Sequence, residues 1–103
     1  MLLIREVFHC RPGKVRSLVE KFQAMSKLGQ KGGMPPMRIL TDMAGARYWT
    51  LVAEMEVPSL GEFEKMMSGA GQSAEDGKEI EKIMKDYHDL VESGHREVFK
   101  IEG

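Results

Sequence analysis

The sequence predicts an α+β fold in which helices cover one face of a four-stranded antiparallel sheet. β-like alternation of apolar and polar residues occurs at residues 1–10, 37–43, 47–57 and 95–102, and helical periodicity follows the first and third of these runs. The predicted order is therefore β-α-β-β-α-β. In a chain of 103 residues this order is typical of the ferredoxin-like plait, and we expect residues 1–103 to form a single domain of this kind.

The first predicted strand has apolar side chains on both of its faces. Ile4 and Phe8 lie on one face. Leu3 and Val7 lie on the other, which is typical of a strand that is buried on both sides. Pro12 ends the strand, because proline cannot donate to a ladder. The helix that follows is amphipathic, with apolar residues three and four positions apart: Val15, Leu18, Val19, Phe22 and Met25.

The two middle strands are predicted to form a hairpin. A two-residue loop at residues 44–45 would place Asp42 opposite Arg47 and, further along, Arg38 opposite Leu51. We expect the more apolar row of the second strand to lie beneath the helices: Trp49, Leu51, Ala53, Met55 and Val57. The other row would face away from the helices: Tyr48, Thr50, Val52 and Glu54.

The second helical region is predicted in two parts. Ser59 has capping-box spacing to Glu62 and should begin a short helix. Residues 68–77 are rich in Gly, Ser and Ala and should divide the second helical region into its two parts. A longer helix is expected over residues 74–91, with Gly94 as its stop before the last strand.

Composition and charge exclude several classes of protein. The formal net charge is −1 and the basic residues form no stripe, so nucleic acid is not an expected partner. No apolar run predicts a signal peptide or a membrane span, and the single Cys10 excludes an internal disulfide. We therefore expect a cytoplasmic protein that does not associate with membranes.

The predicted sheet leaves one of its faces uncovered by helices. Because the first strand is apolar on that face too, we expect a second copy of the chain to cover it and form a homodimer.

At the level of the whole chain, the pattern resembles the dimeric α/β-barrel superfamily. The resemblance rests on residues 11–14, on the Tyr48-Trp49 strand, on the capped helix that contains Phe63, and on the closing strand at 94–99. Within the superfamily the chain is most similar to NIPSNAP-like proteins, with antibiotic-biosynthesis monooxygenase-like proteins next. The resemblance implies a homodimer whose sheets pack face to face. It also implies a small-molecule cavity, either between each sheet and its helices or at the interface.

Five polar residues form the candidate site. Alternation directs Arg5, His9, Tyr48, Thr50 and Glu54 towards one cavity, where they would bind a ligand or make hydrogen bonds and ion pairs across the dimer interface. The first hypothesis is a homodimer that binds a small apolar or amphipathic molecule in a cavity lined by some of the 9 methionines, with Arg5, Thr50 and Glu54 as ligand contacts.

The alternative hypothesis is a cofactor-independent enzyme. It would be an oxygenase or isomerase of aromatic or polyketide-like substrates, with His9 as the base and Tyr48 or Arg5 polarising a carbonyl. Superfamily oxygenases often place a Trp near an Asn, and this chain contains no Asn, so Trp49 is expected in the core instead.

The sequence contains no recognisable motif for binding a metal ion or a cofactor. No two histidines share metal-ligand spacing with a carboxylate, and no Gly-rich segment follows a strand in the phosphate-binding manner. We predict neither a metal nor a cofactor. Cys10 is expected to be a buried, unreactive thiol.

Overall fold

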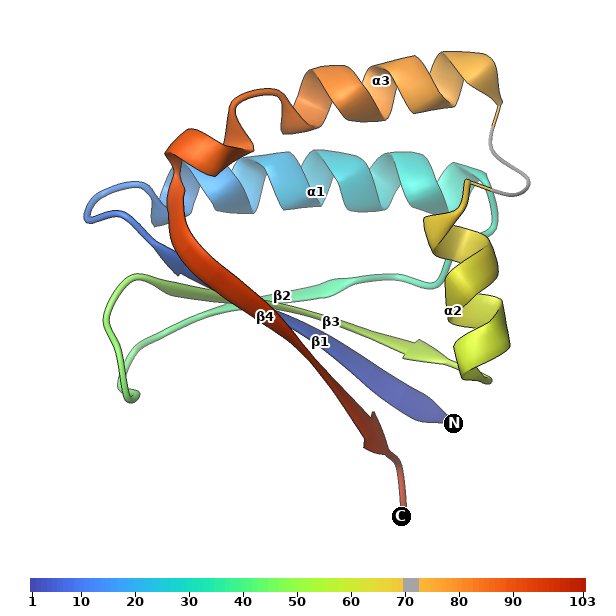
Figure 1. Cartoon of the computed structure of the whole chain (residues 1–103), viewed down its shortest axis with the longest axis horizontal. Coiled ribbons are helices and arrows are strands. Elements are labelled where there is room, and N and C mark those ends of the chain that lie inside the picture. Colours follow the sequence, from blue (N-terminus) through green and yellow to red (C-terminus); the bar gives the residue numbers. More distant parts are fainter. Residues whose placement is uncertain (70–72) are drawn as a thin grey trace.

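A computed structural model describes residues 1–69 and 73–103 of the chain (Figure 1). The strands are β1 (Leu2–Cys10), β2 (Arg38–Thr41), β3 (Thr50–Val57) and β4 (Val91–Lys100). The helices are α1 (Val15–Lys31), α2 (Leu60–Met67), α3 (Ala74–Met84) and the short 3-10 helix η1 (Tyr87–Asp89). All strand pairs are antiparallel in the order β2-β3-β1-β4, and the helices lie on one side of the sheet (Figure 1). The predicted α+β, ferredoxin-like fold is confirmed. The sheet of one chain is not closed, since β2 and β4 are its two edges.

The core lies between α1 and the helix-facing side of the sheet. Leu18 and Phe22 of α1 pack in one cluster with Cys10 and Leu51, and the Phe8 and Phe22 rings are 5.3 Å apart. Because Leu18 and Leu51 are fully buried, each contributes about 1.5–3 kcal/mol of hydrophobic stabilisation. A second cluster joins α2 to the sheet through three buried residues: Ile4, Val57 and Phe63.

Local signals account for the beginnings of α2 and α3. The Ser59 hydroxyl accepts a hydrogen bond from the Glu62 amide at 3.2 Å, so the predicted cap of α2 is present. The Glu62 carboxylate lies 3.5 Å from Lys65 Nζ. Ser73 caps α3 in the same way through the Asp76 amide. The break predicted at 68–77 agrees with the end of α2 and the start of α3, while its residues 70–72 lie outside the described part of the chain.

The predicted hairpin register is wrong. Arg38 lies opposite Glu54 instead of Leu51, which is a shift of three residues. Because an odd shift turns a strand over, Arg38 lies on the face away from the helices. The cause is the connection at 42–49, where Trp49 has φ +60° and therefore interrupts the extended backbone.

Asp42 and Arg47 consequently do not face each other in a ladder. The Asp42 carboxylate accepts a hydrogen bond from the Thr50 amide at 2.8 Å. Arg47 Nη2 lies 3.5 Å from a carboxylate oxygen of Glu92. The side chain of Asp42 thus binds the first amide of β3 instead of an arginine.

The helix predicted over 74–91 is also too long. It ends at Met84, because Lys85 has ψ 134°, which is outside the helical range, and Asp86 then adopts a left-handed conformation with φ +65°. The last strand begins at Val91 rather than at 95 and pairs with the whole of β1. Gly94 is therefore inside a strand. A Cβ there would lie 3.0 Å from Phe8 Cδ1, so glycine allows the Phe8 ring to lie against β4.

No helix in the described residues is both long enough and apolar enough to cross a membrane.

Candidate functional site

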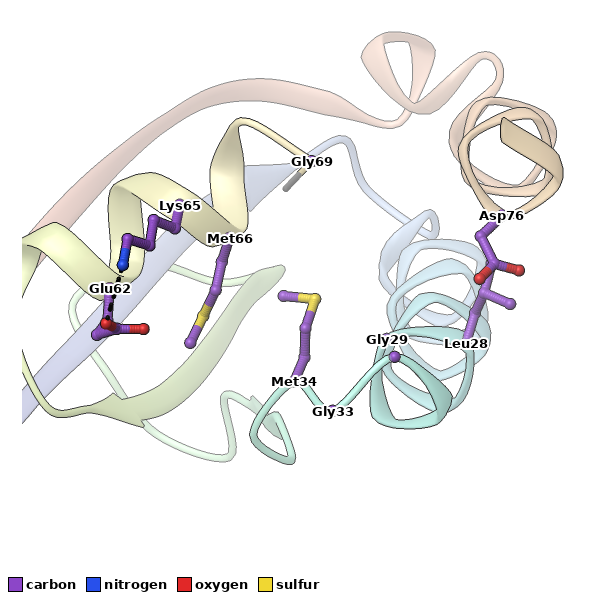
Figure 2. A pocket seen from close by; sticks show the side chains of 10 residues that line it. Leu28, Gly29, Gly33, Met34, Glu62, Lys65, Met66, Gly69 and Asp76 are labelled. Carbon is purple, nitrogen blue, oxygen red and sulfur yellow. Dashed lines mark ion pairs between the residues drawn. The ribbon is translucent and has the colours of Figure 1, made fainter. Parts of the chain in front are cut away.

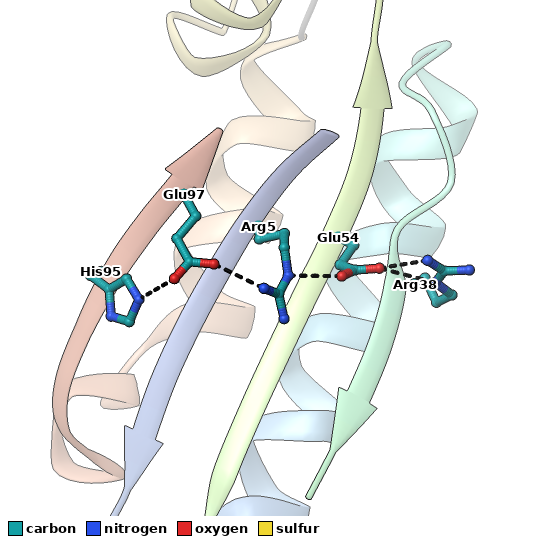
Figure 3. A network of polar contacts seen from close by, with 5 residues as sticks. All are labelled: Arg5, Arg38, Glu54, His95 and Glu97. Carbon is teal, nitrogen blue, oxygen red and sulfur yellow. Dashed lines mark hydrogen bonds and ion pairs between the residues drawn. The ribbon is translucent and has the colours of Figure 1, made fainter. Parts of the chain in front are cut away.

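Ion pairs form a row across all four strands on the face away from the helices (Figure 3). Arg5 of β1 lies opposite Glu54 on one side and Glu97 on the other, at 2.9 Å from each. Arg38 of β2 lies 2.6 Å from Glu54, and His95 Nε2 lies 2.9 Å from Glu97. We call these five residues the polar row. Two residues of the predicted candidate site, Arg5 and Glu54, lie together in the polar row.

Glu54 is the buried centre of the polar row. It is only 8% exposed, and its carboxylate oxygens are bonded by Arg38 and Arg5. The hydrogen bond from Arg38, followed by the one from Arg5, lowers the pKa of Glu54. A buried carboxylate would otherwise be costly, so the two guanidinium groups keep Glu54 ionised within a single chain.

His9 lies on the same face, beyond the polar row. Its Nδ1 is 3.4 Å from Thr50 Oγ1, and its ring is 6.1 Å from that of His95. Burial, the Arg47 charge and His95 lower the pKa of His9. The imidazole is therefore neutral at neutral pH and able to accept a proton.

Tyr48 is not part of this arrangement. It lies in the 42–49 connection and is 84% exposed, because β3 begins only at Thr50. Trp49 is also in the connection and is 43% exposed, so its predicted place in the core is wrong. The catalytic roles of His9 and Tyr48 stay predictions, as do the ligand contacts of Arg5, Thr50 and Glu54.

Sequence reasoning missed Arg38, His95 and Glu97. Arg38 was assigned to the wrong face by the three-residue error in register. Alternation along the last strand carries the signal for the other two, since His95 and Glu97 share a face two residues apart and pair with β1.

The other side of the sheet holds a cavity of about 240 Å³ between the strands and the helices. Its lining is mainly apolar and rich in methionine: Met25, Met34, Met37, Met55, Met66 and Met67. Phe22 and Phe63 also line it. Because methionine side chains adapt their shape, such a cavity suits an apolar guest.

A more open hollow of about 390 Å³ adjoins this cavity (Figure 2). The two share Met34 and Met66, which lie on facing sides of the hollow in Figure 2. Its lining includes three charged residues: Glu62, Lys65 and Asp76. The apolar cavity thus lies beside a hollow that carries charged residues.

Glu6 brings one charge to the cavity lining. It lies on the helix-facing row of β1, and its Oε1 accepts a hydrogen bond from Nε of Arg96, its partner on β4. The Arg96 guanidinium is 4.9 Å from the centre of the Phe63 ring. Ring and carboxylate together fix the arginine, and the arginine fixes Glu6.

His9 and the cavity lie on opposite faces of the sheet. The cavity is lined by Ile4 and Glu6 of β1, and alternation places His9 on the other face. Cys10 faces the helices, but burial raises the pKa of its thiol and leaves it protonated. Within residues 1–69 and 73–103, no three His, Cys, Asp or Glu side chains are placed to hold a metal ion.

Solved structures share this fold. An uncharacterized NIPSNAP domain protein from Burkholderia xenovorans superposes with a TM-score of 0.75 at 13% identity, covering 99% of this chain and 95% of that one. An antibiotic biosynthesis monooxygenase superposes with a TM-score of 0.66 at 10% identity, covering 100% of both chains. A dimeric protein of unknown function with a ferredoxin-like fold from Bacteroides fragilis gives 0.64 at 14% identity, covering 97% and 96%.

At these identities the likeness shows the fold. It confirms the structural resemblance to NIPSNAP-like and monooxygenase-like proteins that the sequence predicted. Comparison of the sequence with protein-family models and with curated proteins found no match.

Proposed function

We propose that the protein is a homodimer that binds a small apolar or amphipathic molecule between its sheet and its helices. The methionine-lined cavity of about 240 Å³ is the observation that carries this proposal. Apolar cavities of about 150 Å³ already bind benzene, so this one has room for a guest of one or two rings. The charged residues that line the adjoining hollow support a guest that also has a polar end.

The dimer is supported by the face that the helices leave uncovered. Apolar residues lie there on either side of the polar row, and Leu40 and Phe99 are 39% and 48% exposed. The two arginines and two glutamates of the polar row carry no net charge, so a second copy could approach without repulsion. The Bacteroides fragilis protein of similar fold is dimeric, which is in keeping with this assembly.

An oxygenase or isomerase is not proposed as a second function. The predicted base, His9, lies on the face of the sheet opposite the methionine-lined cavity, so it is not placed to act on a molecule bound in that cavity.

Binding can be tested by calorimetry with indole as the probe. We expect saturable binding with one site per chain. Met66→Trp should abolish it, because the larger ring would occupy the cavity. Met43→Trp is the matched control, since Met43 is fully exposed in the 42–49 connection and should leave binding unchanged. Equal binding by both variants, or none by the unmodified protein, would contradict the proposal.

A further inference from the structure

Glu6 is an acidic residue in a row that otherwise faces the core. Its neighbours on that row are Ile4, which is 1% exposed, and Phe8, which packs against α1. A carboxylate in such surroundings is costly unless it is bonded. Arg96 meets part of this cost, and the Glu6 side chain stays 25% exposed. Among the described residues, Glu6 is the one charged residue that lines the cavity.

Arg96 engages only one oxygen of Glu6. The hydrogen bond goes to Oε1, and no described residue donates a hydrogen bond to Oε2. A carboxylate has about four acceptor positions, so Glu6 has capacity for a further donor. Since Glu6 lines the cavity, a bound molecule can supply that donor.

The surroundings of Glu6 set the chemistry of this donor. Arg96 already balances the carboxylate charge, which favours a neutral hydroxyl over an ammonium group and disfavours an anion. Phe22, Phe63 and the methionine sulfurs favour an aromatic body. We infer that Glu6 is the specificity residue of the cavity and selects a small phenol of one or two rings, an inference that rests on the proposed binding function.

Two probes that differ by one O-methyl group test this inference by calorimetry. Para-propylphenol has a hydroxyl donor, and para-propylanisole carries a methyl group in place of that proton. A hydrogen bond to a charged acceptor corresponds to a preference of about 10- to 100-fold for the phenol.

The variant pair Glu6→Gln and Glu56→Gln assigns the preference to one carboxylate. The amide at position 6 keeps the size of the side chain but is a weaker, neutral acceptor, so the preference should fall to about 3- to 10-fold. Glu56 is an exposed residue of β3 that does not line the cavity, and its variant should keep the full preference.

Three results would count against the inference. Equal affinity of the unmodified protein for both probes would overturn it and leave cavity binding standing. A preference that Glu6→Gln does not reduce would do the same. Failure of both probes and of indole to bind would overturn the proposed function together with this inference.

Discussion

Arg5 and Glu54 lie directly opposite each other on β1 and β3, with Arg5 Nε 2.9 Å from Glu54 Oε2. The same guanidinium reaches Glu97 on β4 through Nη1, so one arginine joins three strands. Side chains that face each other across an antiparallel pair are the unit that stabilises a sheet. Here Arg5 also balances the charge of Glu54, which is only 8% exposed.

We expect Arg5→Met to destabilise the fold by about 1–3 kcal/mol, the cost of removing a partner from a buried polar group. Urea unfolding at a fixed protein concentration measures this change. Lys100→Met is the control, because Lys100 and Glu102 are both largely exposed and their pair should contribute less than about 0.5 kcal/mol. Equal loss in the two variants would show that the arginine has no special role.

The pKa of Glu54 predicts an acid-sensitive stability. Hydrogen bonds from Arg38 and Arg5 lower that pKa below the ordinary 4.5, so the unfolded chain binds this proton more readily than the folded one. The stabilisation is present above pH 4.5 and is lost as the pH falls through the lower, folded value. Glu54→Gln should flatten the dependence of the unfolding free energy in this range, and Glu56→Gln should leave it unchanged.

The sequence was enough to predict the order of the elements, because periodicity reports which residues of a segment are buried. It also placed Arg5 and Glu54 on the face away from the helices, since that requires only the alternation within each strand. The partner Arg38 could not be found in the same way. Its position depends on the length of the hairpin connection, and therefore on the left-handed Trp49 and on the Asp42 side chain.

The cavity was harder to predict than the polar row. The abundance of methionine indicated an adaptable lining, but the space itself depends on how α2 and the end of α1 are spaced over the sheet. One local feature of that spacing is Gly29, where a Cβ would lie 3.1 Å from Met34 Sδ. The packing of α2 against β1, β3 and the end of α1 joins segments that are distant in the sequence, and such packing leaves no periodic signal.

Gly94→Ala should destabilise the protein by about 1–3 kcal/mol, the usual cost of overpacking. The added Cβ would lie 3.0 Å from Phe8 Cδ1 and 3.2 Å from the Val7 carbonyl oxygen, and the backbone oxygen has little freedom to move. Thermal unfolding gives the measurement. Gly45→Ala is the matched control, because a Cβ at Gly45 meets nothing within 4 Å. A stability equal to that of the control would show that β4 can move away from Phe8.

Val52→Asp tests the proposed dimer and the face of the sheet through which its two copies would meet. Val52 lies on the face away from the helices, opposite Val7 and Leu40, and a stable dimer there should bury about 1,200–2,000 Å² in total. A new carboxylate without a partner would be costly in that interface, so we expect dissociation to a monomer in light scattering. Leu60→Asp is the control, because Leu60 is 53% exposed at the start of α2 and lies on the helix side. A dimer that survives Val52→Asp but not Leu60→Asp would mean that the copies meet through their helices.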